Sequence, residues 1–157
     1  MGMDVYGRKP KSEVGEYFRR NVWGWRPLWE YCCSIHIDII GEKLAKYGHY
    51  NAGYGLGLQK SVKLAKALKE DIRSGLALEY ITERDKFLAE LPDQKCEYCD
   101  ENGNRTWPEG DKQVVKLCNA CSGKKSVRPF QTYYFLRVDD IEEFSQFLEN
   151  CGGFNIY

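Results

Sequence analysis

The apolar positions of this chain recur mainly with the period of an α-helix. The pattern is clearest over residues 58–74, where leucine, alanine and isoleucine gather on one face and lysine and arginine spread over the opposite half. Weaker patterns of the same period predict helices over residues 12–21, 27–47 and 77–91. Glycine or proline follows the helices at 58–74 and 77–91, as is typical of helix ends. We therefore expect a mainly helical body.

The C-terminal residues show a different pattern. Residues 130–138 are rich in aromatic and β-branched side chains, which favours a strand. Asp139 and Glu142 then form the Asp-x-x-Glu pattern of a helix start, and the apolar positions that follow predict a helix that ends at Gly152. Residues 154–157 form a candidate terminal strand. A few short strands are thus expected near the C-terminus.

Four of the seven cysteines form two C-x-x-C pairs. Cys96 pairs with Cys99, Cys118 pairs with Cys121, and eighteen residues separate the two pairs. Each short pair can supply two thiolates from one turn, and the intervening loop can return the second pair to complete a tetrahedron. This spacing predicts a structural Zn²⁺ site rather than disulfides.

The zinc site divides the chain into two predicted domains. Residues 93–128 are expected to form a zinc-ribbon-like lobe, in which 105–107 and 113–117 pair as a hairpin. Residues 1–92 and 129–157 are expected to form the helical body. The predicted class is α+β, with a mainly helical body, a small zinc-ribbon-like lobe and a few short C-terminal strands. A lobe this small would need its ion to fold.

A glycine-rich stretch at residues 48–57 leads directly into the most amphipathic helix. Its glycines would let the backbone come close to a ligand, and the helix start behind them presents N–H groups that suit an anion. The stretch can also be a turn that joins two helices, and both interpretations stay open. The candidate ligand-binding residues of this region are Asn51, Gly53, Tyr54, Gly55, Gly57, Lys60 and Lys63.

Three of the four tryptophans lie within seven residues, from Trp23 to Trp29. As structure, they would form an aromatic plug between helices. As a binding site, Trp23 and Trp25 would stack on a flat ligand while Arg26 contacts an anion. The two interpretations differ in whether the rings are exposed.

Charge and composition limit the classes of partner and compartment. The formal net charge is zero, which argues against a general nucleic-acid binder, and duplex DNA is not an expected partner. No stretch has the apolar length of a membrane span, and no signal-peptide pattern opens the sequence. Seven cysteines, four of them assigned to metal, do not resemble a secreted disulfide framework. We expect a soluble, cytoplasmic protein without a membrane partner.

Catalytic residues are hard to find in this sequence. The two histidines, His36 and His49, lie outside hydrolase, metalloprotease and kinase motifs. Cys33 lies one helical turn before His36, but a cysteine on an apolar helix face is usually a core residue. A zinc ion with four thiolate ligands has no open position for a substrate. Enzymatic activity therefore stays uncertain, and a binding function is the stronger expectation.

Two local resemblances concern the cysteine segment. The span from Cys96 to Cys121, with Trp107 inside it and Cys-Asn-Ala-Cys at its end, resembles a GATA-type finger. The Cys-Asn-Ala-Cys-Ser-Gly run is similar to half of a DnaJ-type cysteine-rich unit. The loop is mixed in charge and the chain has two knuckles where the DnaJ-type unit has four. DNA reading and chaperone activity are therefore not expected.

A third resemblance covers nearly the whole chain. The runs at residues 25–28, 51–56 and 147–154, together with the two cysteine pairs, are similar to those of a family of small uncharacterised phage and bacterial proteins. That resemblance implies no established activity, but it is consistent with a phage-borne accessory role, including interference with a host defence signal.

These patterns lead to one main functional expectation and two alternatives. We expect a non-catalytic, zinc-stabilised binding protein that captures a small anionic or nucleotide-derived ligand at the glycine-rich stretch. The first alternative is an adaptor that binds a protein or single-stranded nucleic acid through the zinc lobe. The second is a phosphodiester hydrolase whose site no motif marks. Self-association is also expected, because aromatic residues make up 14% of the chain.

Overall fold

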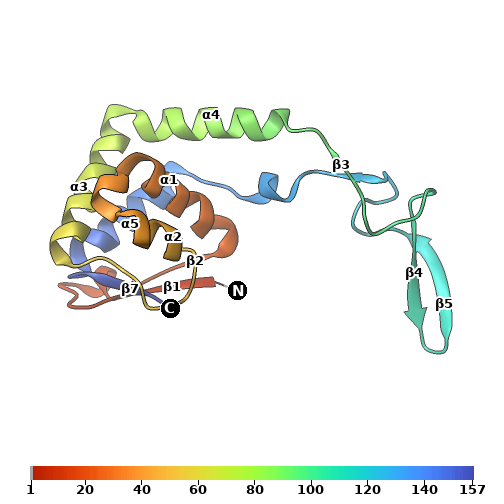
Figure 1. Cartoon of the computed structure of the whole chain (residues 1–157), viewed down its shortest axis with the longest axis horizontal. Coiled ribbons are helices and arrows are strands. Elements are labelled where there is room, and N and C mark those ends of the chain that lie inside the picture. The colour runs from red at the N-terminus through yellow and green to blue at the C-terminus, as the bar shows by residue number, and fades with distance from the viewer. Residues whose placement is uncertain (1) are drawn as a thin grey trace. The chain divides into compact units, whose positions relative to one another are not determined.

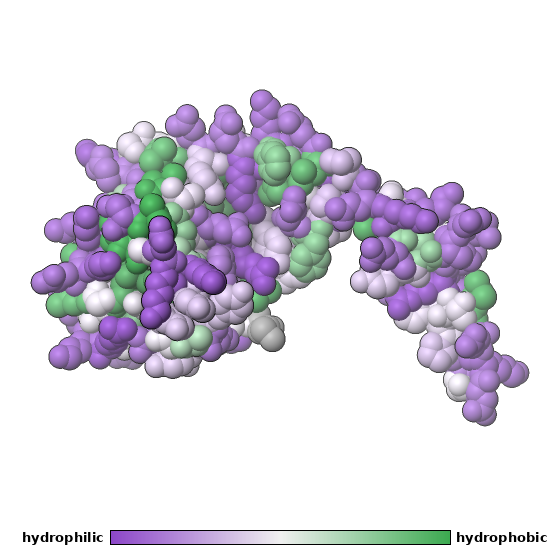
Figure 2. Space-filling view, in the orientation of Figure 1, coloured by the Kyte–Doolittle hydropathy of each residue, from purple (hydrophilic) through white to green (hydrophobic). Residues whose placement is uncertain are grey.

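The computed structural model describes residues 2–157, which fall into two compact units (Figure 1). The first unit, called the body, comprises the residues up to Asp85 and Tyr134–Tyr157. The second unit, called the lobe, is Lys86–Tyr133. In the described part of the chain no helix is both long and apolar enough to cross a membrane. The face shown in Figure 2 is mostly hydrophilic.

The lobe extends beyond the predicted residues 93–128 at both ends. On the N-terminal side, the guanidinium of Arg128 donates to the backbone carbonyls of Leu88 at 2.7 Å and Leu91 at 2.5 Å. These bonds satisfy carbonyl groups at a helix end, which have no partner within the helix. The last turn of this helix, α4 (Leu76–Glu90), therefore belongs to the lobe.

A three-stranded antiparallel sheet in the body joins the two ends of the chain. In spatial order its strands are β2 (Tyr17–Asn21), β1 (Gly2–Gly7) and β7 (Phe154–Ile156). Val5 on the central strand pairs with Phe18 on β2 and with Ile156 on β7. All three side chains are buried, which fixes one face of the sheet toward the core.

The predicted helix over residues 12–21 is wrong. Only Glu13–Gly15 form a short 3-10 helix, η1, and the end of the segment forms β2. The segment forms a strand because Phe18 is buried while its neighbours Tyr17 and Arg19 are exposed, which is the alternation of a strand. In addition, β1 supplies the backbone hydrogen-bond partners. That partner strand is not visible in the local sequence.

Five helices complete the described chain. In chain order they are α1 (Val22–Ile40), α2 (Glu42–Tyr47), α3 (Leu58–Ser74), α4 (Leu76–Glu90) and α5 (Val138–Asn150). The sheet packs against α5, where the ring centroid of Phe144 lies 5.0 Å from that of Phe18. The helices predicted at 58–74 and, to within one residue at each end, at 77–91 are confirmed. Gly75 between them has a left-handed φ of 88°.

The single helix predicted over residues 27–47 is two helices with an earlier start. Asn21 caps α1, because its side-chain oxygen accepts the backbone N–H of Gly24 at 3.0 Å. The helix is kinked at His36. It stops at Gly41, whose φ of 83° separates α1 from α2.

The strand predicted over residues 130–138 is also wrong. Phe130–Tyr133 form a short 3-10 helix, η2, and the following residues lead into α5 without joining a described strand. Tyr134 packs against α1 instead, with its ring centroid 5.2 Å from that of Trp23. Aromatic residues favour a strand only where they can pack on a sheet, and here a helix offers the surface.

The start of α5 lies earlier than the predicted cap. The carboxylate of Asp140, rather than that of Glu142, accepts the backbone N–H of Arg137 at 3.0 Å. The helix therefore begins at Val138 instead of after Asp139. The terminal strand predicted after this helix is confirmed as β7.

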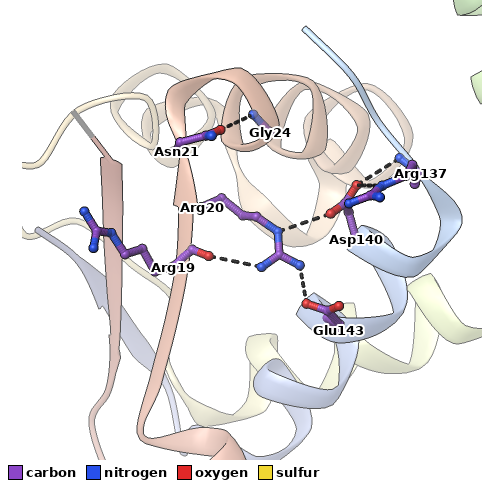
Figure 3. Close-up of polar contacts among 7 residues, drawn as sticks. All are labelled: Arg19, Arg20, Asn21, Gly24, Arg137, Asp140 and Glu143. Atoms are coloured by element: carbon purple, nitrogen blue, oxygen red, sulfur yellow. Dashed lines mark hydrogen bonds and ion pairs between the residues drawn. The ribbon is translucent and has the colours of Figure 1, made fainter.

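A partly buried ion pair ties β2 to the start of α5 (Figure 3). Asp140 is 3% exposed, and its Oδ1 accepts from Nε of Arg20 at 3.2 Å. The same guanidinium donates to the carbonyl of Arg19 at 3.1 Å and to the carboxylate of Glu143. It also lies 4.7 Å from the ring centroid of Phe18. Because each nitrogen of the guanidinium has a partner, Arg20 is a structural residue.

We expect Asp140→Ala to lower the free energy of unfolding by about 3 kcal/mol, because it removes the buried counter-charge of Arg20. Glu143→Ala is the matched control, since Glu143 contacts the same guanidinium but its side chain is 58% exposed. Its expected loss is below about 1 kcal/mol. Urea unfolding of both variants measures the difference. Equal losses would contradict the role assigned to Asp140.

Candidate functional site

The four predicted metal ligands lie together in the lobe. The Sγ atoms of Cys96 and Cys118 are 3.8 Å apart, and those of Cys99 and Cys121 are 3.7 Å apart. All four sulfur atoms lie within 4.8 Å of one another, and the described cysteines form no disulfide. A tetrahedral site with metal–sulfur bonds of about 2.3 Å has sulfur–sulfur edges of about 3.8 Å. The four thiols can therefore hold a metal ion.

Two turns of similar design bring the cysteine pairs together. The backbone N–H of Cys96 donates to the carbonyl of Lys125 at 2.8 Å, and that of Cys118 donates to the carbonyl of Gly103 at 2.9 Å. Each pair is thus bonded to the turn that follows the other pair. A Cβ atom on Gly103, whose φ is 78°, would lie 2.4 Å from the carbonyl oxygen of Gly123. Glycine is required there by both the left-handed backbone and the close approach.

The burial of the cysteines indicates a structural rather than a catalytic centre. Cys96, Cys118 and Cys121 are at most 5% exposed, and Cys99 is half-buried. An ion held by four protein thiolates keeps no coordination position for water or substrate. The arrangement can fasten the lobe, but it does not offer a Lewis-acid site.

Two thiols of the cluster have pKa values shifted in opposite directions. Burial, reinforced by the thiols of Cys121 and Cys96, raises the pKa of Cys99 to about 12. Burial also acts to raise the pKa of Cys121, but hydrogen bonds from the backbone N–H of Lys125 and from the neighbouring thiols outweigh it and lower that pKa to about 7. The opposite directions arise because the thiols of Cys99 and Cys121 interact and titrate together. Because metal binding must displace protons, we expect the metal affinity to fall as the pH decreases.

Two small sheets carry these turns. Their strands are β4 (Asn104–Glu109) paired with β5 (Lys112–Leu117), and β3 (Gln94–Lys95) paired with β6 (Ser126–Val127). The first pair is the predicted hairpin, in which Trp107 faces Val114 and Arg105 faces Lys116. The second pair was not predicted, because two-residue strands leave no periodic signal.

A groove of about 770 Å³ lies on the lobe beside the cysteines. Tyr98, from within the first C-x-x-C pair, and Ala120, from within the second, both line it. Tyr98, Phe130 and Tyr133 give it an aromatic wall, and each of these side chains is more than half exposed. The other lining residues are Gln94, Lys95, Glu97, Val127 and Arg128.

The glycine-rich segment, predicted as a ligand loop or a turn, extends the edge of the sheet. The backbone N–H of Phe154 donates to the carbonyl of Leu56, and that of Ile156 donates to the carbonyl of Tyr54, each at 2.9 Å. The segment therefore runs beside β7. A Cβ atom on Gly55 would lie 1.7 Å from the carbonyl oxygen of Phe154. Packing against β7 thus accounts for this glycine without a ligand.

Two other residues predicted for that ligand site have protein partners. The ring of Tyr54 stacks on that of Tyr47 with centroids 4.7 Å apart. Nζ of Lys63 lies 3.6 Å from a carboxylate oxygen of Asp38, although both side chains are exposed. Both side chains therefore have partners within the body that account for their positions without a ligand.

The remaining residues of the predicted ligand site are spread around the start of α3 and the sheet. Asn51 donates to the carbonyl of Gly2 at 3.3 Å. Gly53 has a φ of 76° and packs beside Tyr157. No described side chain caps the start of α3 after Gly57. Lys60 is exposed in the first turn of this helix. The uncapped helix start and this lysine therefore still match part of the predicted anion site.

The tryptophan cluster is mainly a core feature. Trp25 is fully buried and stacks on Trp29 with ring centroids 5.4 Å apart, so it cannot stack on a ligand. Trp23 is partly buried against Tyr134. The exposed Arg26 lies 5.9 Å from the centroid of the same tyrosine ring. The aromatic-plug interpretation therefore fits Trp25, and the flat-ligand interpretation does not.

A buried polar network between α1 and α3 was not predicted. Asp71 is 5% exposed, accepts from the hydroxyl of Tyr31 at 2.7 Å and lies 2.7 Å from Nε2 of His36. Burial, with this hydrogen bond, raises the pKa of Tyr31 well above its ordinary value.

Burial also raises the pKa of Cys33 to about 12, so its thiol stays protonated at neutral pH. Cys33 and His36 therefore do not form a reactive pair.

The second histidine, His49, has a pKa below its ordinary value. Burial lowers its pKa, with the nearby charge of Arg26 acting in the same direction and that of Glu30 opposing it. The ring is therefore neutral and lies in the body beside the tryptophan cluster.

Comparison of the chain with protein-family models, curated proteins and solved structures gives no match.

Proposed function

We propose that this chain is a non-catalytic, zinc-stabilised binding protein whose groove on the lobe holds an apolar segment of a partner protein. The observation that carries the proposal is that the groove is built partly from the two C-x-x-C turns. Tyr98 and Ala120 line the groove from within the two C-x-x-C pairs. A metal held by these pairs would fix the shape of the groove without touching the partner.

Zn²⁺ is the ion that this ligand set suits best. Thiolates select soft or borderline metals, and four of them in a closed tetrahedral set are typical of structural zinc. The sulfur separations of 3.7 Å and 3.8 Å support that geometry. The closed set also supports a binding role rather than hydrolysis of a phosphodiester.

The charges of the groove favour a protein segment over a phosphate-bearing ligand. Arg128 lines the groove, but its guanidinium is bound to the carbonyl of Leu88 at 2.7 Å and to the carboxylate of Asp93 at 3.2 Å. Of the lining residues, Lys95 keeps an exposed positive charge, and Glu97 opposes it. Phosphate recognition needs converging cations, whereas the centres of protein interfaces are enriched in aromatic side chains and depleted of charged ones.

The small anionic ligand expected at residues 48–57 has weaker support. The backbone of that stretch pairs with β7, and Gly55 is needed for the pairing. The lobe instead presents exposed aromatic side chains in a hollow, and tyrosine is among the residues that contribute most to protein interfaces.

A display library of random peptides, selected on the zinc-loaded full chain, tests the proposal. We expect the enriched peptides to share an apolar or aromatic residue. They should bind a variant with Tyr98→Ala and Phe130→Ala at least about thirtyfold more weakly, because truncation of central aromatic residues typically costs about 2 kcal/mol or more. Isothermal titration calorimetry with the selected peptides measures the change.

Val115→Ala is the matched control for this experiment. Val115 is an apolar residue of the same lobe, is 62% exposed and lies on β5 outside the groove lining. Its variant should bind the peptides as the natural chain does. Failure to enrich any peptide, or equal binding by the groove variant, would overturn the proposal. Competition by an oligonucleotide for the same groove would replace the protein partner with nucleic acid.

A further inference from the structure

We propose that the outer face of the three-stranded sheet in the body binds single-stranded nucleic acid. The site is called the tyrosine face and consists of Tyr6 on β1, Tyr17 on β2 and Tyr157 directly after β7. It goes beyond the proposed function, because it uses the body instead of the lobe and a different class of partner.

Strand register places the three tyrosines side by side. Tyr6 is the direct cross-strand partner of Tyr17. Tyr157 exchanges two backbone hydrogen bonds with Asp4 on β1, at 3.0 Å and 2.7 Å. The ring centroid of Tyr6 lies 5.0 Å from that of Tyr17 and 6.1 Å from that of Tyr157. Since side chains alternate along a strand, these rings lie opposite the buried Val5 and face away from the core.

The rings of the tyrosine face remain open to solvent. Tyr6 is 47% exposed, Tyr17 is 44% exposed and Tyr157 is 51% exposed. Aromatic side chains on an exposed sheet are a common platform for single-stranded nucleic acids, because every base can stack on a ring. Bases in a duplex are stacked on each other, so the same platform would discriminate against a duplex.

Basic residues border the tyrosine face. Residues 2–21 contain five basic and three acidic residues, one of the basic ones being the structural Arg20, although the whole chain has no net charge. The side chain of Arg19 is 62% exposed and points away from α5 in Figure 3. The exposed segment 8–11 adds three basic residues directly after β1. Arg8 is held toward the sheet, because its Nε donates to Oδ1 of Asn155 on β7 at 2.9 Å.

The acidic side chain of this face contacts one ring and one cation. Asp4 accepts from the hydroxyl of Tyr17, which holds that ring in place. It also lies 3.4 Å from Nε of Arg19. Because this contact uses Nε, the terminal nitrogens of Arg19 stay suited to a phosphate. Rings that accept bases and flanking cations that accept phosphates are the two elements that single-strand binding requires.

Fluorescence anisotropy with labelled oligothymidylate and oligouridylate of about 20 nucleotides tests the proposal on the full chain. We expect Tyr6→Ala to weaken binding at least about tenfold, because a stacking ring is lost. Tyr6→Phe should bind as the natural chain does, since the ring remains. Arg19→Gln should reduce the slope of log affinity against log salt by about 0.7, the value for one phosphate contact on a single strand.

Phe87→Ala is the matched control, because Phe87 is a 61% exposed aromatic residue outside both the tyrosine face and the groove. Its variant should keep the affinity for both oligonucleotides, and Tyr98→Ala then tests separately whether they bind at the groove. Loss of binding in Tyr98→Ala but not in Tyr6→Ala would overturn the proposal, as would absence of binding at low salt. Loss of self-association in Tyr6→Ala, with no oligonucleotide bound, would make the face an interface between copies.

Photo-crosslinking tests the same site on the natural chain, so its result does not depend on whether a variant folds. A thiouridine-containing oligonucleotide crosslinked to the natural chain should label peptides that contain Tyr6, Tyr17 or Tyr157. Crosslinks confined to the lobe would overturn the proposal.

Discussion

Chelation of zinc is expected to unfold the lobe while the body keeps its structure. The buried cluster of the lobe consists of Cys96, Cys118 and Cys121, with Cys99 and Val127 packed against it. So little apolar surface cannot offset the entropy of ordering the segment. A structural zinc ion contributes on the order of 10 kcal/mol in such cases, which makes this the largest effect that we predict.

Hydrogen exchange read by mass spectrometry, with and without chelator, measures this effect by segment. Amides in residues 93–128 should lose protection, and those of β1 and α3 should keep it. Native mass spectrometry should find one zinc ion per chain. Cys118→Ser should lose the ion, whereas the control Cys33→Ser should keep it, because Cys33 lies in α1 outside the cluster. A lobe that stays protected without metal would contradict the central role of the cysteines.

Gly55→Ala is expected to destabilise the body by at least about 3 kcal/mol, a large part of the stability of a typical domain. The added Cβ would lie 1.7 Å from the carbonyl oxygen of Phe154, so the segment would have to move away from β7. Equilibrium unfolding in urea, followed by tryptophan fluorescence, measures the loss, because Trp25 and Trp29 are buried in the body.

Gly57→Ala is the control for this prediction. Its φ is −76°, which any residue can adopt, and no described atom outside its immediate neighbours lies within 4 Å of a Cβ built there. Its expected loss is below about 1 kcal/mol. The pair also separates the two interpretations of the glycine-rich stretch. If Gly55 served only a ligand, Gly55→Ala would keep the stability of the free protein.

Local patterns predicted the elements whose causes are local. The helix at residues 58–74 was found because its apolar face repeats over several turns and a glycine ends it. The hairpin between the cysteine pairs was found because turn residues separate two strand-forming runs. The cysteine cluster was found because a metal site needs ligands at short, fixed spacings.

Distant partners decided the elements that were missed. Residues 17–21 form a strand because β1 is beside them, and residues 130–138 do not, because α1 takes the aromatic surface of Tyr134. The tyrosine face depends on the same pairing, since its members come from both ends of the chain. Nothing in the sequence near Tyr6 indicates that Tyr157 lies beside it.

The sequence by itself determined that the chain is α+β, that its most regular helix spans residues 58–74 and that four cysteines can meet at one ion. Those results follow from periodicity and spacing over short distances. Only the tertiary structure decided that Trp25 is core, that Gly55 packs against β7 and that aromatic rings stay open in the groove and on the tyrosine face. Exposure depends on which distant segments cover a side chain, and a local pattern carries no information about them.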